Sequence, residues 1–280
     1  MSNTSNQTYK ELAIPYFNEV FIIVDEVLSA MEIPFYLIGV SAMALELLKD
    51  GIKPARGTKD IDFAIMISSI QEFEEVVKQL EQKGFNKVKA PWTLYHPTFK
   101  VAIDLMPFGE IEEYDTVNFN ERYTDLHVLG FKEVLEDTTS VEIEEKIAQI
   151  PPLYGMIILK LVAWSDRPEE RDNDLKDILL IIKKYYNLNW EEIVTSHYDT
   201  FPEGELDEQL IAARVLGRKA AEILTKSDRL RNRIVDVLKN NSDDISNAPI
   251  AERWARENDW TVEYSTQIIK ELKRGIEEIL

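Results

Sequence analysis

Apolar and polar positions follow two different periods in the first part of the chain, and these periods predict helices and strands in turn. Residues 9–31 carry apolar side chains at spacings of three and four, as on one face of a helix. Short runs with few charges predict buried strands at 34–39, 60–67, 93–96 and 99–106. Helical spacing predicts two further helices, at 42–50 and 70–83.

Polar residues predict where two of these helices begin. Ser41 follows the first strand and can cap the helix at 42–50, which Gly51 would end. Ser69 and Glu72 have the spacing of a capping box, in which each side chain bonds a backbone amide at the start of a helix. Gly84 would end that second helix.

The pattern changes after residue 150, and this change predicts the fold class. Residues 106–150 indicate loops and short strands, including one near 140–145, whereas the chain from Leu153 onward has helical spacing throughout. Strands with helices followed by helices alone predict an α+β fold. We expect a disordered lead-in at 1–10, an α+β domain at 11–198 and a helical domain at 199–280.

Composition narrows the chemistry that the protein can perform. The 280 residues include no cysteine and three histidines, which excludes disulfides and thiolate metal sites and disfavours a zinc site. The absence of cysteine also fits a cytoplasmic protein. No stretch of about 18 apolar residues is present, so we expect no membrane span. The net charge of −19 repels nucleic acid, unless a local basic groove or a divalent metal offsets it.

Three aspartates lie in or beside apolar strands. Asp60 and Asp62 are two positions apart, so in a strand they point to the same face, and Asp104 interrupts a second apolar run. If the two strands are neighbours, the three carboxylates meet, and a hard cation such as Mg²⁺ or Mn²⁺ would offset their repulsion. The alternative is that the Asp-x-Asp unit is only a strand-end turn or a helix cap.

Several motifs follow one another in a characteristic order. They are "LIGVSAMALEL", "RGTKDIDFAI", Gly84 with Phe85, "IDLMPFGEIE", "LGFKE", "PPLYGMIILKLVAWSDR", "KDILLII" and Tyr185. This series resembles the predicted nucleotidyltransferases related to the AbiEii and AbiGii toxins of toxin–antitoxin systems, over about residues 30–190.

The resemblance implies a polymerase-β-like nucleotidyltransferase head, which is a mixed sheet with helices, followed by a helical C-terminal part. It implies that Asp60, Asp62 and Asp104 hold two magnesium ions, and that Gly39 and Ser41 contact the triphosphate. A helix N-terminus suits that contact because its free amides attract phosphate. The chain departs from the family in two respects: Val40 separates the glycine from the serine, and the spacing to Asp60 is longer.

The resemblance also implies roles for Lys160, Arg167 and Asp177, which match a family motif around the nucleotide. Lys160 lies in an apolar helix, where a phosphate or a carboxylate would compensate its charge. A snorkelling lysine or a buried pair with Asp177 is the alternative. Arg56 and Thr58 precede the aspartates and are further candidates for nucleotide contacts, although Arg56 could equally pair with Asp60.

These observations together predict a magnesium-dependent nucleotidyltransferase that moves a nucleoside monophosphate from a nucleoside triphosphate, such as ATP, to an acceptor. The acceptor stays open among transfer RNA, a protein hydroxyl and a small molecule. The resemblance further implies a toxin with an antitoxin as partner. The alternative function is a catalytically degenerate module of the same fold, which binds a nucleotide or a protein without chemistry.

Overall fold

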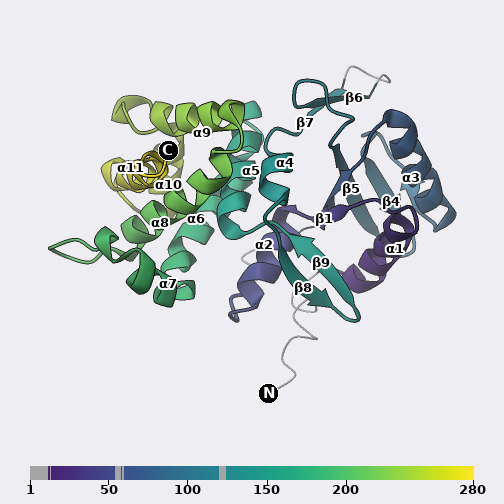
Figure 1. Cartoon of the computed structure of the whole chain (residues 1–280), viewed down its shortest axis with the longest axis horizontal. Helices are drawn as coiled ribbons and strands as arrows, with labels where there is room; N and C mark the ends of the chain where they lie inside the picture. The colour runs from purple at the N-terminus through teal and green to yellow at the C-terminus, as the bar shows by residue number, and fades with distance from the viewer. Residues whose placement is uncertain (1–11, 13, 54–57, 59, 120–123) are drawn as a thin grey trace. The chain divides into compact units, whose positions relative to one another are not determined.

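The computed structural model describes residues 12, 14–53, 58, 60–119 and 124–280, except for the side chain of Thr124. The chain forms two compact units that divide between Pro152 and Leu153. Figure 1 shows strands and helices in the first unit and helices in the second. The predicted α+β class, with a mixed sheet followed by a helical C-terminal part, is therefore confirmed.

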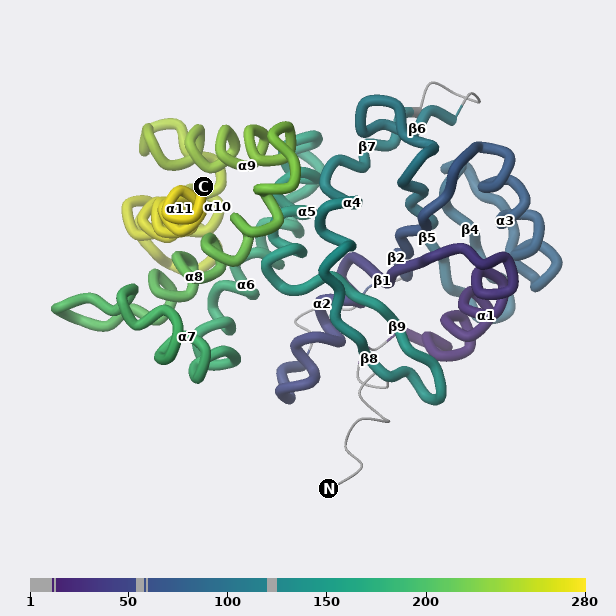
Figure 2. The backbone as a smooth tube through the Cα atoms, in the orientation of Figure 1, coloured from purple at the N-terminus to yellow at the C-terminus, as the bar shows by residue number. Residues whose placement is uncertain are grey.

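A mixed sheet forms the centre of the first unit. Its strands are β1 (Phe35–Leu37), β2 (Asp60–Met66), β5 (Val101–Phe108), β4 (Thr93–His96) and β3 (Asn86–Lys87), in this spatial order. β2 and β5 are parallel, and the other neighbours are antiparallel. Parallel strands need a crossover, which α3 (Ile70–Gln82) and the β3–β4 hairpin supply, as the tube in Figure 2 shows.

The two faces of this sheet differ in burial. Ile61, Phe63 and Ile65 are fully buried on one face, where the ring of Phe21 in α1 (Phe17–Ala30) lies 6.2 Å from that of Phe63. Residues of the opposite face, such as Asp60 and Asp62, are only half-buried. The strand alternation therefore puts the apolar side chains into the core and leaves the carboxylates on the more accessible face.

The helix starts agree with the sequence at one position and differ at another. Ser69 caps α3 as predicted, because its hydroxyl accepts a hydrogen bond from the Glu72 amide at 3.3 Å. The carboxylate of Glu72 accepts from the amide of Ser68 instead of Ser69. The predicted cap at Ser41 is wrong: α2 (Gly39–Leu48) begins three residues before the predicted start at residue 42, with Ile38 as the N-cap.

The rest of the first unit consists of two small hairpins and a short helix, a region where the sequence predicted only loops and short strands. The strands β6 and β7 pair with each other, as do β8 and β9. The elements are β6 (Thr116–Phe119), β7 (Thr124–His127), α4 (Phe131–Leu135), β8 (Thr139–Ile143) and β9 (Lys146–Ile150).

The second unit, all of whose residues are described, consists of helices. α8 and α11 approach so closely that a Cβ on Gly217 would lie 2.1 Å from the Leu272 carbonyl oxygen, and one on Gly275 would lie 2.0 Å from that of Arg214. The helices are α5 (Leu153–Asp166), α6 (Asp172–Leu188), α7 (Trp190–Ser196), α8 (Glu208–Leu224), α9 (Asp228–Asn240), α10 (Pro249–Asn258) and α11 (Val262–Glu277), with short 3₁₀ turns at Tyr198–Thr200 and Ile245–Asn247.

The compact units divide the chain earlier than the predicted domains, whose boundary lies between 198 and 199. Residues 153–198 group with the later helices because α5 and α6 both pack against α8. The predicted disordered lead-in at 1–10 lies outside the described residues.

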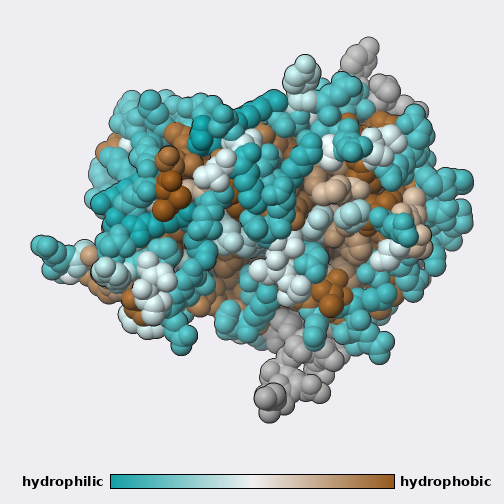
Figure 3. Space-filling view, viewed as in Figure 1, coloured by the Kyte–Doolittle hydropathy of each residue, from teal (hydrophilic) through white to brown (hydrophobic). Residues whose placement is uncertain are grey.

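No helix in the described part of the chain has the length and apolar character that crossing a membrane requires. Hydrophilic side chains cover most of the surface seen in Figure 3.

Candidate metal and nucleotide site

Asp60, Asp62 and Asp104 come together on the half-buried face of the sheet, and we call them the aspartate triad. β2 and β5 pair in parallel with Asp62 opposite Asp104, and Asp60 lies two positions earlier on the same face. Each aspartate offers one carboxylate oxygen, and these oxygens all lie within 4.8 Å of one another. The strands that carry the aspartates are thus neighbours, which was the condition for a common site.

Threonine hydroxyls contact two members of the triad. Oγ1 of Thr58 donates a short hydrogen bond to Oδ1 of Asp60 and lies 3.2 Å from the Asp60 carbonyl oxygen. Oγ1 of Thr93 in β4 donates to Oδ1 of Asp104 at 2.5 Å. Thr58 was predicted as a nucleotide contact, and the structure places its hydroxyl on a carboxylate of the triad.

Gly39 contacts the third member of the triad, Asp62. Its φ of +66° lies in the left-handed region, and a Cβ on Gly39 would be 2.0 Å from Oδ2 of Asp62. The backbone amide of Ile38 also donates to the carbonyl oxygen of Asp62 at 2.9 Å. Only glycine therefore allows the start of α2 to approach the carboxylate this closely.

Ser41 lies in the first turn of α2, two residues after Gly39. Its side chain is 1% exposed, and Oγ has no hydrogen-bond partner among the described residues. A buried hydroxyl without a partner costs about 1–3 kcal/mol. The N-terminus of a helix carries a partial positive charge, so this turn favours an anion near its amides.

Lys160 belongs to the second unit and lies between two carboxylates, and we call this group the Lys160 network. Its Nζ is 2.8 Å from Oδ2 of Asp177 and 3.1 Å from Oδ1 of Asp174, and the lysine is 7% exposed. Burial alone would lower the pKa of Lys160, but the two carboxylates outweigh burial, and the pKa is raised. The structure thus contains the buried pair with Asp177 that the sequence left open.

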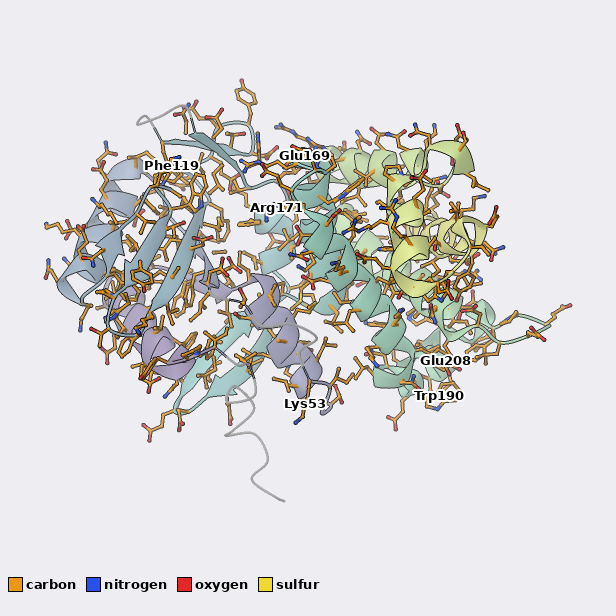
Figure 4. All side chains as sticks on the ribbon, turned by 180° about the vertical axis from the view of Figure 1, so that it is seen from behind. Lys53, Phe119, Glu169, Arg171, Trp190 and Glu208 are labelled. Carbon is orange, nitrogen blue, oxygen red and sulfur yellow. The ribbon has the colours of Figure 1, made fainter. Side chains whose placement is uncertain are left out.

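Two other predicted nucleotide-binding residues are Arg167 and Arg56. Arg167 directly follows α5 and is exposed, with Nη1 3.8 Å from Oε2 of Glu170. Arg56 lies outside the described residues. Figure 4 shows Arg171 and Trp190 at opposite ends of α6, the helix that carries Asp174 and Asp177 of the Lys160 network.

Two residues of these groups, Thr93 and Asp174, were not predicted as site residues from the sequence. Thr93 starts the predicted strand 93–96, but the strand pattern does not say which residue it faces on the next strand. Asp174 was assigned to no site, although it is three residues before Asp177 and so on the same helix face. A hairpin that pairs residues 93–96 with 101–104 would have placed Thr93 opposite Asp104, and this pairing was the signal that could have identified Thr93.

The residues of the aspartate triad fit a divalent cation. Carboxylate oxygens are the ligands that Mg²⁺ and Mn²⁺ prefer, and three of them converge here from two neighbouring strands. Gly39 brings a helix N-terminus against the same carboxylates, which adds a place for an anion that accompanies the metal. The donor set and its surroundings therefore suit a metal with a phosphate ligand.

No family model matches the sequence, and no curated protein matches it. Several solved structures resemble the chain. An antigenic nucleotidyltransferase-like protein from Paracoccidioides brasiliensis is 14% identical, with a TM-score of 0.39 over 79% of this chain and 93% of that protein. ANT(2″)-Ia in complex with adenylyl-2″-tobramycin is 11% identical, with a TM-score of 0.40 over 77% and 97%.

A tRNA-processing enzyme in its apo form covers more of this chain at a lower score. It is 14% identical, with a TM-score of 0.26 over 92% of this chain and 78% of that enzyme. At such identities and scores the likeness supports no statement about activity.

Proposed function

We propose that the protein is a magnesium-dependent nucleotidyltransferase, which moves a nucleoside monophosphate from a nucleoside triphosphate such as ATP to an acceptor. The observation that carries this proposal is the aspartate triad, whose ligand oxygens lie within 4.8 Å of one another beside the N-terminus of α2. A cluster of carboxylates beside an anion-binding helix end suits a metal–triphosphate complex.

The proposed reaction gives each aspartate a task. Asp60 and Asp62 would bridge two Mg²⁺ ions, and Asp104 would bind one of them and help to take the proton from the acceptor. When bound, the ions would neutralise the charge that develops on the phosphates. An acceptor oxygen would form a bond to the α-phosphorus, the bond from that phosphorus to the bridging oxygen would break, and pyrophosphate would leave.

The start of α2 would hold the phosphates in this proposal. The amides after Gly39 would face the triphosphate, and a phosphate oxygen would give Ser41 Oγ the partner it lacks among the described residues. Lys160, Arg167 and Asp177 remain predictions as nucleotide contacts. For Lys160, that role would compete with its two carboxylate partners.

Pyrophosphate release and calorimetry test the proposal together. We expect the wild-type protein to bind a nucleoside triphosphate in the presence of Mg²⁺ and to release pyrophosphate when acceptors are supplied. Asp62→Ala should lose turnover, because the metal contributes several kcal/mol of charge stabilisation. No triphosphate binding by the wild type, or turnover equal to wild type in Asp62→Ala, would contradict the proposal.

A binding module without chemistry is the second candidate function. Two observations favour it: Lys160 is already engaged by carboxylates, and Ser41 in the altered Gly-Val-Ser segment is almost completely buried. Such a module would bind Mn²⁺ and a triphosphate but release no pyrophosphate with any acceptor. The same calorimetric and turnover measurements therefore separate the two functions.

The biological role is a further part of the proposal and rests on the family resemblance alone. A toxin of the AbiEii type would slow the growth of a bacterial host, and a co-expressed antitoxin would prevent this. The acceptor could then be transfer RNA, a protein or a small molecule in the cytoplasm. Equal growth of hosts that express the wild type and Asp62→Ala would contradict the toxin role.

A further inference from the structure

Thr93 is the residue directly opposite Asp104 on the neighbouring strand. β4 and β5 are antiparallel with Thr93 paired to Asp104, so both side chains stand on the half-buried face of the sheet. Thr93 Oγ1 donates a hydrogen bond of 2.5 Å to Oδ1 of Asp104. Asp104 therefore has an aspartate beside it on β2 and a hydroxyl beside it on β4.

The hydrogen bond from Thr93 restricts the rotation of the Asp104 carboxylate, which metal binding would otherwise have to restrict. The carboxylate of an aspartate turns broadly about its last bond, and its orientation decides which oxygen faces the other ligands. Mg²⁺ demands near-ideal octahedral geometry, so it binds best where the oxygens are already oriented. A hydrogen bond from a fixed strand residue supplies that orientation to Asp104.

A second threonine repeats the arrangement at the other end of the triad. Thr58 Oγ1 donates to Oδ1 of Asp60, as Thr93 does to Oδ1 of Asp104. Asp62 is positioned differently, by the close approach of Gly39. Each aspartate of the triad thus has its own neighbour that limits how its carboxylate can move.

A threonine in a strand needs no functional explanation, because β-branched residues suit strands. The hydroxyl is what distinguishes Thr93 from valine, which has nearly the same shape and the same preference for strands. Replacing Thr93 by valine therefore removes the hydrogen bond to Asp104 and leaves the strand preference in place.

We propose that Thr93 is a positioning residue, which orients the Asp104 carboxylate for a divalent metal ion. This inference rests on the proposed function, because the aspartate triad must bind the metal for its orientation to matter. In this role Thr93 acts through its hydrogen bond to Asp104.

The test measures Mn²⁺ binding to the full chain by counting free Mn²⁺ with electron paramagnetic resonance. We expect Thr93→Val to weaken Mn²⁺ binding by about 10- to 100-fold, as is typical when a partner of a metal ligand is removed. Thr93→Ser keeps a hydroxyl and should bind Mn²⁺ nearly as the wild type does. Thr116→Val removes a half-buried strand hydroxyl away from the triad and should leave binding unchanged.

Thermal unfolding without metal separates positioning from a structural role. Thr93→Val should unfold at nearly the wild-type temperature while its Mn²⁺ affinity falls. If Thr93→Val fails to fold, Thr93→Ala is measured in its place with the same expectation for Mn²⁺. Wild-type affinity in the hydroxyl-free variant, or an equal loss in Thr93→Ser, would overturn the role of Thr93 alone. No Mn²⁺ binding by the wild type would overturn the metal site itself.

Discussion

The two carboxylate groups of this protein, the aspartate triad and the Lys160 network, differ in burial and in the residues that compose them. Asp177 and Lys160 are 3% and 7% exposed, and the lysine lies within hydrogen-bonding distance of both acids. The triad is half-buried, and its ligand oxygens face one another. The network contains a cation of the chain itself, Lys160, and the triad brings together carboxylate oxygens of the kind that Mg²⁺ and Mn²⁺ prefer.

The Lys160 network should be the more important of the two for stability. Lys160→Met keeps the apolar stem but removes the ammonium group from beside the half-buried Asp174 and the buried Asp177. Breaking a buried ion pair from one side costs about 3–5 kcal/mol, and we expect chemical denaturation to show a loss of this size. Lys160→Met combined with Asp174→Asn and Asp177→Asn should recover part of it. A single variant as stable as the wild type would contradict the comparison.

Asp62 should matter for metal-dependent stability instead. Mn²⁺ at about 100 times its dissociation constant should stabilise the wild type by about 2.7 kcal/mol, because only the folded chain holds the triad together. Asp62→Asn should lose this gain and keep the stability of the metal-free protein. Unfolding with and without Mn²⁺ measures both. An unchanged gain in Asp62→Asn would show that the metal binds elsewhere.

Gly39 and Gly51 form a matched pair that separates backbone strain from contact with the triad. Both have positive φ, but a Cβ on Gly39 would meet Asp62, whereas one on Gly51 has nothing within 4 Å. Alanine at either position should cost about 1–2 kcal/mol for the left-handed backbone. Only Gly39→Ala should also reduce the gain in unfolding temperature from Mn²⁺. Equal responses of the two variants would rule out a special role for Gly39.

Asp199 is exposed and pairs with Arg218, so its contribution to stability can be compared with that of the buried Lys160 network. Hydrogen bonds from Arg218, with one of 2.8 Å from Nη1, lower the pKa of Asp199 to about 2. A lowered pKa stabilises the fold above the unfolded value of 3.8, and this contribution disappears as the pH falls through about 2. Asp199→Asn should cost less than about 1 kcal/mol at pH 7, since solvent screens the pair.

The pH dependence of unfolding checks this last expectation. The difference between Asp199→Asn and the wild type should shrink between pH 3.8 and about 2. A cost at pH 7 as large as that of Lys160→Met would mean that charge pairing, rather than burial, makes the Lys160 network important.

Strand bounds and helix caps that depend on the local residue pattern could be predicted from the sequence. Features that depend on which residues are neighbours in space could not. The strand 93–96 was predicted with its observed bounds, and the capping of α3 by Ser69 follows from its spacing to Glu72. The helix start at Gly39 was missed because Ser41 is a better N-cap by residue type than Ile38, which the structure uses. The close approach of Gly39 to Asp62 involves a residue that the chain reaches only later.

The site could be predicted only in part for the same reason. Asp60, Asp62 and Asp104 stand out as charges in apolar strands, so their sequence positions are visible before the fold is known. Their convergence depends on β2 pairing with β5, which period-two alternation does not specify. Thr93 and Asp174 carry no such signal, because a strand threonine and a helical aspartate are common without any site.

The most direct test of the metal site is a crystal soaked with Mn²⁺ and a non-hydrolysable nucleoside triphosphate. We expect anomalous density in contact with Asp60, Asp62 and Asp104, with the triphosphate toward the start of α2. Manganese density at another place, or a triphosphate bound away from the triad, would contradict it.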